Sequence, residues 1–335
     1  MALSNTARKG RTNSDLGKRI AAVVAALLAA YLGIALLLGW YWSRSPDPFD
    51  VRAAAQLRLG QEELPSGAVT TSTLAIVAET LLRKPGGYTS NDILPPGLLM
   101  DNMPSWEYGA LVQIRDLARS LRNDMSRSRS QSLEDPDLAE AEPRFNYRSD
   151  AWIFPSTESQ YKIGVSYLNR YLQRLTAPNR TETPFYPRAD NLEDWLNVVN
   201  QRLGSLSQRL SASVGQYRVN MDQDGRGEGN EVFAKTPRLK VDNVFYEARG
   251  ATWALLHFLK AVEIDYESVL RDKNAQASLR QVIRELEAAQ RAIRSPIVLN
   301  GSGYGIFANH SLTMGSYIAR ANAALIDLRN ILRQG

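Results

Sequence analysis

The stretch IAAVVAALLAAYLGIALLLGWYW, residues 20–42, contains no charged side chain in twenty-three positions. An α-helix of this length extends about 34 Å, which is enough to cross the ~30 Å hydrocarbon core of a bilayer. Because lipid offers the backbone no hydrogen-bond partners, a segment that spans it must be helical. The stretch is longer than the core of a signal peptide and ends in Trp40, Tyr41 and Trp42 instead of small residues, so we expect an uncleaved anchor.

The charges that flank residues 20–42 predict an orientation. Residues 1–19 hold five basic side chains and one acidic side chain, whereas the charges just after residue 42 cancel. Basic flanks stay on the cytoplasmic side, so we expect a cytoplasmic tail at 1–19 and an exported body. The tail supplies four of the five net positive charges of the chain. The body is therefore close to neutral, and we expect no nucleic-acid partner.

The residue inventory restricts the chemistry that the body can perform. The chain has no cysteine and two histidines. Disulfides, thiolate metal sites and cysteine nucleophiles are therefore excluded, and imidazole ligands are scarce. We expect no cofactor and no metal.

Apolar residues recur at alternating steps of three and four through most of the body, which predicts helices that pack side by side. The predicted helices cover 71–83, 105–125, 156–175, 190–214, 243–270, 279–293 and 314–332, with a shorter one at 51–60. Asp190 and Glu193 have the spacing of a capping box. Each run ends in turn residues after about three heptads, which favours an antiparallel bundle over one long coiled coil. The sequence thus predicts a mainly α protein, with a membrane anchor followed by an antiparallel helical bundle.

Three segments interrupt this pattern. Residues 88–104 form a loop that we expect to pack down through its apolar side chains, which are Ile93, Leu94, Leu98, Leu99 and Met100. Residues 126–150 are rich in charge and serine and predict an exposed polar linker between a membrane-proximal helical part, 43–125, and a bundle, 151–335. Residues 216–240 either remain a loop or form a small β-hairpin that projects from the bundle.

Part of the 216–240 segment has the spacing of a calcium loop. In NMDQDGRGEGNE, residues 220–231, Asn220, Asp222, Asp224 and Glu231 stand at positions one, three, five and twelve. Asparagine replaces the usual aspartate at the first position, and Thr236-Pro237 interrupts the helix that should follow. These departures favour an acidic hairpin tip, with calcium as the alternative.

Glu107 is the acid that we would test for catalysis. It lies at the start of a predicted helix between Trp106 and Tyr108, which are candidate binding residues. An apolar setting of this kind can raise the pKa of a carboxyl and make it a general acid. An acidic residue in the first turn of a helix is also favoured by the helix dipole alone. Because no second carboxylate is placed beside it by the sequence, the structural interpretation is favoured.

Two further stretches hold candidate binding residues. Residues 242–250 form either a binding groove or a polar network between helices, and the glycine-rich connection before the last helix either cradles a ligand or is only a tight turn between helices. The candidate binding residues of the first are Asp242, Asn243, Tyr246, Glu247 and Arg249. Those of the second are Asn300, Ser302, Tyr304 and His310. The other histidine, His257, lies off the heptad stripe, and we expect it at the surface or its boundary.

Six stretches resemble a family of Gram-negative envelope proteins catalogued as domain of unknown function family 2333. They are KPGGY (84–88), PPGLLMDNMPSWEYG (95–109), RADN (188–191), RLGSLSQRLSASVG (202–215), DNVFYEARG (242–250) and LNGSGYGIFANHS (299–311). The resemblance implies a single-pass protein of the inner membrane with a periplasmic body. It implies no catalytic residues.

The favoured hypothesis is a non-enzymatic envelope protein that binds or scaffolds other envelope proteins through its bundle, with inner-membrane lipid around its anchor. A homo-oligomer is left open. The alternatives are a peptidoglycan-active enzyme that uses Glu107 and a periplasmic ligand-sensing module.

Overall fold

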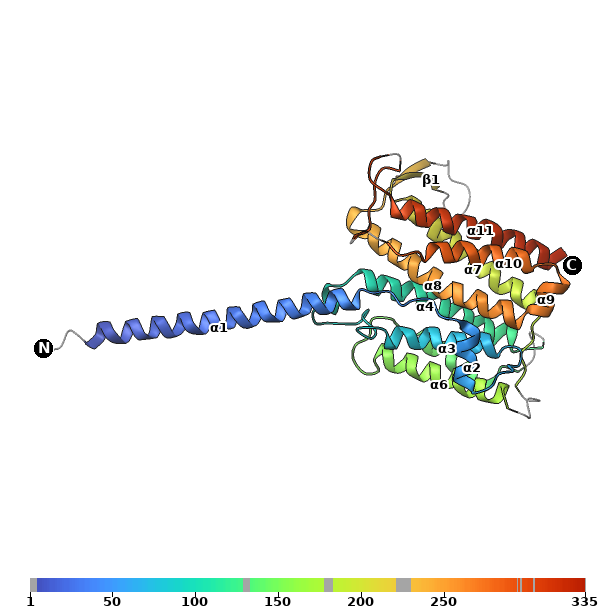
Figure 1. Ribbon diagram of the computed structural model, residues 1–335, viewed down its shortest axis with the longest axis horizontal. Coiled ribbons are helices and arrows are strands. Elements are labelled where there is room, and N and C mark those ends of the chain that lie inside the picture. Colours follow the sequence, from blue (N-terminus) through green and yellow to red (C-terminus); the bar gives the residue numbers. More distant parts are fainter. Residues whose placement is uncertain are drawn as a thin grey trace.

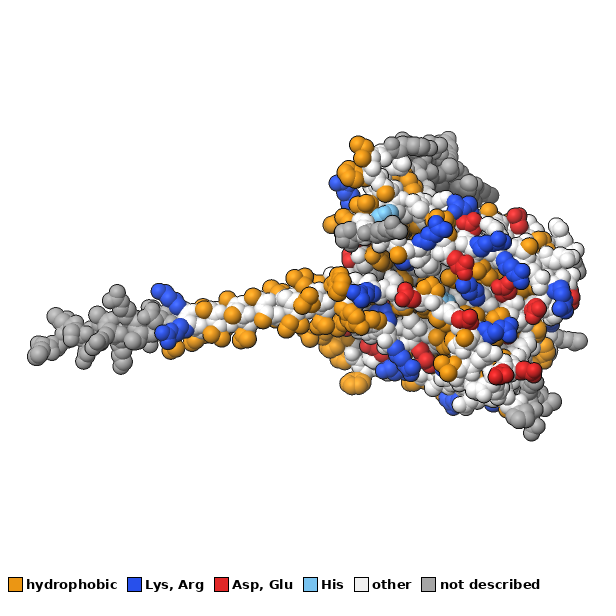
Figure 2. Space-filling view, viewed as in Figure 1, with side chains coloured by type: hydrophobic (Ala, Val, Ile, Leu, Met, Phe, Trp, Pro, Cys, Tyr) orange, Lys and Arg blue, Asp and Glu red, His pale blue; other side chains and the backbone are white. Residues whose placement is uncertain are grey.

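A computed structural model describes residues 5–128, 133–177, 183–220, 230–293, 295, 297–303 and 305–334. It shows one long helix, α1 (Asn5–Trp42), attached to one end of a helical body (Figure 1). Within α1, residues Leu16–Trp42 have a mean hydropathy of 2.6 over their most apolar window, so the segment is long and apolar enough to cross a membrane. Apolar side chains cover this part of α1 along its length (Figure 2).

The body is built from ten α-helices and one hairpin in the part of the chain that the structure describes. The α-helices are α2 (Val51–Leu59), α3 (Ala68–Arg83), α4 (Asn102–Ser120), α5 (Pro136–Phe145), α6 (Thr157–Leu175), α7 (Ala189–Ser211), α8 (Val241–Asp265), α9 (Glu267–Asp272), α10 (Gln276–Ala289) and α11 (His310–Gln334). Short helical turns are η1 (Gly97–Leu99), η2 (Leu121–Met125) and η4 (Arg238–Lys240). Strands β1 (Gln216–Asn220) and β2 (Asn230–Ala234) pair antiparallel. The predicted mainly α fold is confirmed, and the interruption at 216–240 contains a hairpin.

Helices α4 and α8 approach closely at the centre of the body because each supplies a glycine at the crossing. A Cβ atom on Gly109 would lie 2.0 Å from the carbonyl oxygen of Glu247, and one on Gly250 would lie 1.9 Å from that of Trp106. Both helices begin at the end of the body where α1 joins, so this central pair runs parallel (Figure 1). The heptads alone did not specify that direction.

A single large cluster of buried apolar residues joins α3 through α11. Its largest fully buried side chains include Trp106, Trp195, Trp253, Tyr161, Tyr171 and Tyr266. The predicted stripes of α7 and α11 meet in this cluster, where Leu196, Leu203, Ile318 and Leu325 are all buried. Residues of both predicted parts, 43–125 and 151–335, therefore share one core.

His257 is wholly buried, contrary to the expected surface position. Its Nε2 atom accepts a hydrogen bond from the Phe49 N–H at 3.0 Å, and the two rings stack with centroids 4.0 Å apart. Burial lowers the pKa of His257 to about 4. The expectation was wrong because a heptad stripe describes one packed face, whereas α8 also packs against the segment that leads from α1.

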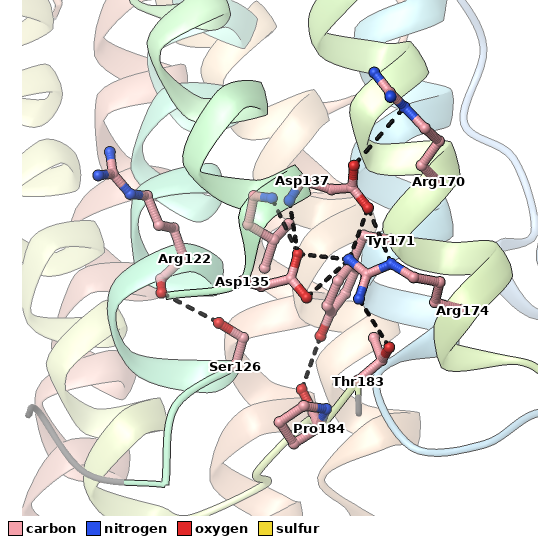
Figure 3. A network of polar contacts seen from close by, with 10 residues as sticks. Arg122, Ser126, Asp135, Asp137, Arg170, Tyr171, Arg174, Thr183 and Pro184 are labelled. Carbon is pink, nitrogen blue, oxygen red and sulfur yellow. Dashed lines mark hydrogen bonds and ion pairs between the residues drawn. The ribbon is translucent and has the colours of Figure 1, made fainter. Parts of the chain in front are cut away.

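The prediction of an exposed linker at 126–150 was wrong for residues 136–145, which form α5. Leu138, Ala141 and Phe145 are buried. Asp135 caps the helix, and the Arg174 guanidinium of α6 lies 2.7 Å from Asp135 Oδ1 and 2.7 Å from Asp137 Oδ2 (Figure 3). Two of the acidic residues that suggested an exposed linker, Asp135 and Asp137, are thus partners of an arginine on the neighbouring helix.

Two smaller expectations were also wrong. The residues at Asp190 and Glu193 do not form a capping box, because α7 has Arg188 at its N-cap position and no side chain caps it. The Glu193 carboxylate instead contacts the Arg329 and Arg333 guanidinium groups of α11 at 2.7 and 2.8 Å. The loop at 88–104 does not bury its apolar tip, since Ile93, Leu94, Leu98 and Leu99 are exposed.

Candidate functional site

A polar cleft of about 500 Å³ runs between α4, α7 and α8. Its α4 wall extends from Tyr108 to Arg119, which corresponds to a length of about 17 Å. Three arginines line it, namely Arg119, Arg202 and Arg209. The close packing of α4 on α8 forms part of the cleft lining, because Gly109 and Glu247 both line the cleft and lie next to each other.

Two of these arginines are held in place by carboxylates. Arg202 donates to both oxygens of Asp116, from Nε at 2.8 Å and from a terminal nitrogen at 3.0 Å. Arg209 donates to both oxygens of Glu247 at 2.7 and 2.5 Å. These paired geometries fix the planes of the guanidinium groups and raise the pKa of both arginines.

The arginines retain hydrogen-bonding capacity toward a ligand. Each guanidinium group has five N–H donors, and the paired carboxylate takes two of them at Arg202 and at Arg209. Arg119 is exposed at the far end of the α4 wall. Two bound carboxylates against three guanidinium groups leave the lining with an excess of positive charge, which suits an anionic ligand group.

Glu107 lies outside this cleft and is wholly buried. Its Oε1 atom lies 2.6 Å from Lys84 Nζ and accepts hydrogen bonds from Thr89 N and Oγ1, while Oε2 accepts two from Ser90. Because both carboxylate oxygens are fully hydrogen-bonded, Glu107 holds the 84–90 turn against α4. It has no exposed surface that a substrate could reach. This burial counts against the general-acid hypothesis.

Three further sequence candidates lie in the core or in a second hollow. Trp106 is buried against Trp253, with ring centroids 5.2 Å apart. Arg249 and His310 line a hollow of about 200 Å³ between α8, α10 and α11. Arg249 donates to the carbonyl oxygens of Gln290 and Arg291, so it closes the end of α10, and burial lowers its pKa.

The partly buried start of α8 also carries candidates. Burial, followed by the nearby Asp101 carboxylate, raises the pKa of Asp242. Burial raises the pKa of Tyr246, whose ring lies edge-on to Phe245. The Asn243 backbone N–H donates to Asp242 Oδ1 at 3.1 Å. These groups belong to the packing of α8 on the loop before α4.

Asn300 and Ser302 line a third hollow of about 450 Å³ beside the base of the hairpin. Asn300 Oδ1 accepts a hydrogen bond from Ser311 Oγ at 2.7 Å, and His310 Nδ1 accepts one from Leu299 N at 3.0 Å. These bonds shape the loop before α11. Tyr304 lies outside the described residues.

The described part of segment 220–231 lies in a β-hairpin, whereas the calcium hypothesis requires a loop between two helices. Asn220 is the last residue of β1, and Glu231 lies in β2 opposite Val219, whereas a calcium loop of this spacing stands between helices. Asp222 and Asp224 lie outside the described residues. The described flanks favour the hairpin interpretation.

The structure therefore brings Tyr108 and Glu247 together but separates them from Glu107. Sequence reasoning missed Asp116, Arg202 and Arg209 as site residues. A signal was present, because Arg202 and Arg209 are seven residues apart and so lie on one helix face. Their partners on α4 and α8 could not be read from that spacing.

Comparison with known proteins matches residues 16–335 to the bacterial family described as "Uncharacterized protein conserved in bacteria (DUF2333)". The chain therefore belongs to this family. The comparison finds no matching curated protein and no matching solved structure.

Proposed function

We propose, with membership of this bacterial family as the premise, that the chain is a single-pass inner-membrane protein whose body lies in the periplasm and binds other envelope proteins without catalysis. The apolar span Leu16–Trp42 and the basic residues before it support this placement. Arg44 stacks over Trp40 with 4.4 Å between the guanidinium carbon and the ring centroid. Such pairs suit the headgroup region at the outer end of a membrane helix.

The cleft between α4, α7 and α8 is the binding site in this proposal, and its partner is an acidic, extended segment of another envelope protein. The observation that carries this assignment is the pair of carboxylate-held arginines, Arg202 and Arg209, on one wall. Their guanidinium planes are set before a ligand arrives, which reduces the entropy lost on binding. A cleft of about 17 Å accommodates roughly five extended residues.

Placement is tested by fusing alkaline phosphatase, which is active only after export, to Gly335. The proposal expects activity in whole cells and retention of the fusion in membranes washed with high salt or carbonate. An inactive fusion at Gly335 together with an active fusion at the N-terminus would show the opposite orientation. Release of the protein by the wash would contradict the anchor.

Binding is tested by photo-crosslinking in living cells. A photoreactive amino acid replaces Gln201, an exposed residue of the cleft, and the matched control replaces Gln281, an exposed glutamine on α10 outside the cleft. We expect protein adducts from position 201 that are absent from position 281 and that disappear in the Arg119→Glu variant. Equal adducts at both positions, or adducts that survive Arg119→Glu, would refute the assignment of the cleft.

A further inference from the structure

The apolar loop, residues 93–100, lies against α1 and not only against the body. The Tyr31 hydroxyl donates to the Pro95 carbonyl oxygen at 3.3 Å. A Cβ atom on Gly39 would lie 3.5 Å from Pro96 Cβ, which is van der Waals contact distance, so the loop also lies next to α1 at Gly39. The loop therefore extends from the body along the membrane helix (Figure 1).

This contact sets the depth of the apolar loop. Tyr31 precedes Trp42 by eleven residues, or about 17 Å along α1. Tyr31 is near the middle of the uncharged stretch 20–42. Ala35, one turn later on the same face, has an exposed fraction of only 7 %. Pro96 faces Gly39, only three residues or about 5 Å before Trp42, while the Tyr31 side chain reaches Pro95 from a backbone position about 17 Å before Trp42. The apolar loop therefore enters one leaflet of a ~30 Å hydrocarbon core without passing its midplane.

The side chains of the apolar loop match that depth. All eight residues between Asp92 and Asp101 are apolar or glycine, in the sequence ILPPGLLM. Its four outward side chains are exposed by 49 to 72 %, namely Ile93, Leu94, Leu98 and Leu99. Exposure of this apolar surface to water costs a free energy of roughly 25 cal/mol per Å², and contact with lipid removes that cost.

Three backbone N–H groups of the apolar loop are paired within the loop, which lowers the cost of placing its backbone in lipid. Leu98 N donates to Leu94 O at 3.1 Å, Leu99 N to Pro96 O at 3.0 Å and Met100 N to Gly97 O at 2.9 Å. The two prolines have no N–H to satisfy. At the base of the loop, burial and the Glu107 and Glu158 carboxylates raise the pKa of Asp92, which reduces the cost of a carboxyl group near lipid.

Other exposed apolar residues surround the apolar loop at the same end of the body. The segment before α6 is tied to the base of the loop by a 2.8 Å hydrogen bond from Asn91 Nδ2 to Ala151 O. The segments before α6, α8 and α11 all lie at the end where α1 joins, and apolar side chains gather there (Figures 1 and 2). Their exposed apolar residues include Trp152, Ile153, Phe154, Leu239, Ile306 and Phe307. Arg238 and Lys240 flank Leu239 and are exposed, which suits anionic phospholipid headgroups.

We infer that the apolar loop is a membrane wedge, inserted beside α1 into the outer leaflet, and that the body sits on the bilayer through the apolar residues around it. The inference rests on the proposed membrane placement of α1. The occupant of this surface is phospholipid, because the loop is continuous with the face of a helix that lipid already surrounds. The wedge and α1 together fix the angle of the body relative to the membrane.

The cysteine-free chain allows the depth of single positions to be measured. Leu98→Cys, or Leu99→Cys as a repeat, places an environment-sensitive fluorophore on the wedge, and Leu37→Cys places it on α1. Leu57→Cys on α2 is the matched control, since Leu57 is 87 % exposed and α2 lies away from α1 (Figure 1). The full-length variants are reconstituted in vesicles of phosphatidylethanolamine and phosphatidylglycerol that contain lipids spin-labelled on the acyl chain.

We expect blue-shifted emission and comparable quenching by the spin-labelled lipid at Leu37 and at Leu98 or Leu99, with neither effect at Leu57. A wedge probe that behaves like Leu57 while Leu37 is quenched would overturn the wedge and leave the anchor intact. An unquenched Leu37 probe would overturn the anchor and the wedge together. A wedge probe shielded from aqueous iodide but not quenched by lipid would show a protein partner, and would also overturn the inference.

Discussion

The two ends of the helical body differ in the chemistry that closes them. At the end near α1, connecting segments present exposed apolar side chains, including Phe154 and Ile306. At the opposite end, Arg174 joins Asp135, Asp137 and Thr183 in a polar network (Figure 3). The difference indicates that one end of the same bundle is built to meet an apolar surface and the other to meet water.

The largest effect that tests this comparison concerns the base of the apolar loop. Glu107→Gln leaves the buried Lys84 ammonium without its carboxylate, and we expect the free energy of unfolding to fall by about 3–5 kcal/mol. Urea unfolding of the full-length protein in nanodiscs measures the loss. The double variant Lys84→Met/Glu107→Gln is the control, because it removes both charges while the Gln oxygen can still accept a hydrogen bond from the 89–90 backbone, and it should recover part of the stability. A single-variant loss below about 1 kcal/mol would show that the turn 84–90 does not depend on this pair.

The pH dependence of the free energy of unfolding tests two buried titratable residues in the C-terminal half of α8, which leads away from α1. Burial raises the pKa of Asp265 to about 6, while burial lowers that of His257 to about 4. The folded state binds the proton of Asp265 more tightly than the unfolded state does, so this contribution to the free energy of unfolding is lost as pH rises from about 4 to about 6. The neutral His257 also favours the folded state, so its contribution is lost as pH falls from about 6.5 to about 4. Each shift corresponds to roughly 3 kcal/mol.

Because these two contributions oppose each other, single variants are needed to see them. We expect Asp265→Asn to give a protein whose stability, relative to wild type, rises from pH 4 to pH 6, and His257→Gln to give the reverse slope. Unfolding by urea at a series of pH values provides the measurement. Parallel curves for wild type and both variants would contradict the assigned shifts.

The smallest expected effect lies in the far polar network. Asp135→Ala removes the N-cap of α5 and one partner of Arg174, and we expect a loss of about 1–2 kcal/mol with faster proteolysis near α5. Asp150→Ala is the control, since Asp150 and its partner Arg148 are both exposed and should contribute little. Equal effects of the two variants would remove the distinction between the network and an ordinary surface ion pair.

Particular residues show how far sequence reasoning extended. Heptads placed Leu203 and Leu325 in the core because burial along a helix repeats with the helical period. The same reasoning misplaced His257, because one stripe cannot describe a helix with neighbours on several sides. It also interpreted the charges around α5 as an exposed linker, because Arg174, the partner of Asp135, is nearly forty residues away in the sequence.

The sequence by itself determined the membrane-length rod, the charge asymmetry around it and the helical character of the body, since each of these depends on neighbouring residues or on a short period. Only the tertiary structure decided that Asp116 meets Arg202, that Glu247 meets Arg209 and that Pro95 meets Tyr31. These contacts join residues from different elements, and their formation depends on the direction and closeness of helix packing. No local pattern encodes that geometry, so the cleft and the wedge became visible only in the folded chain.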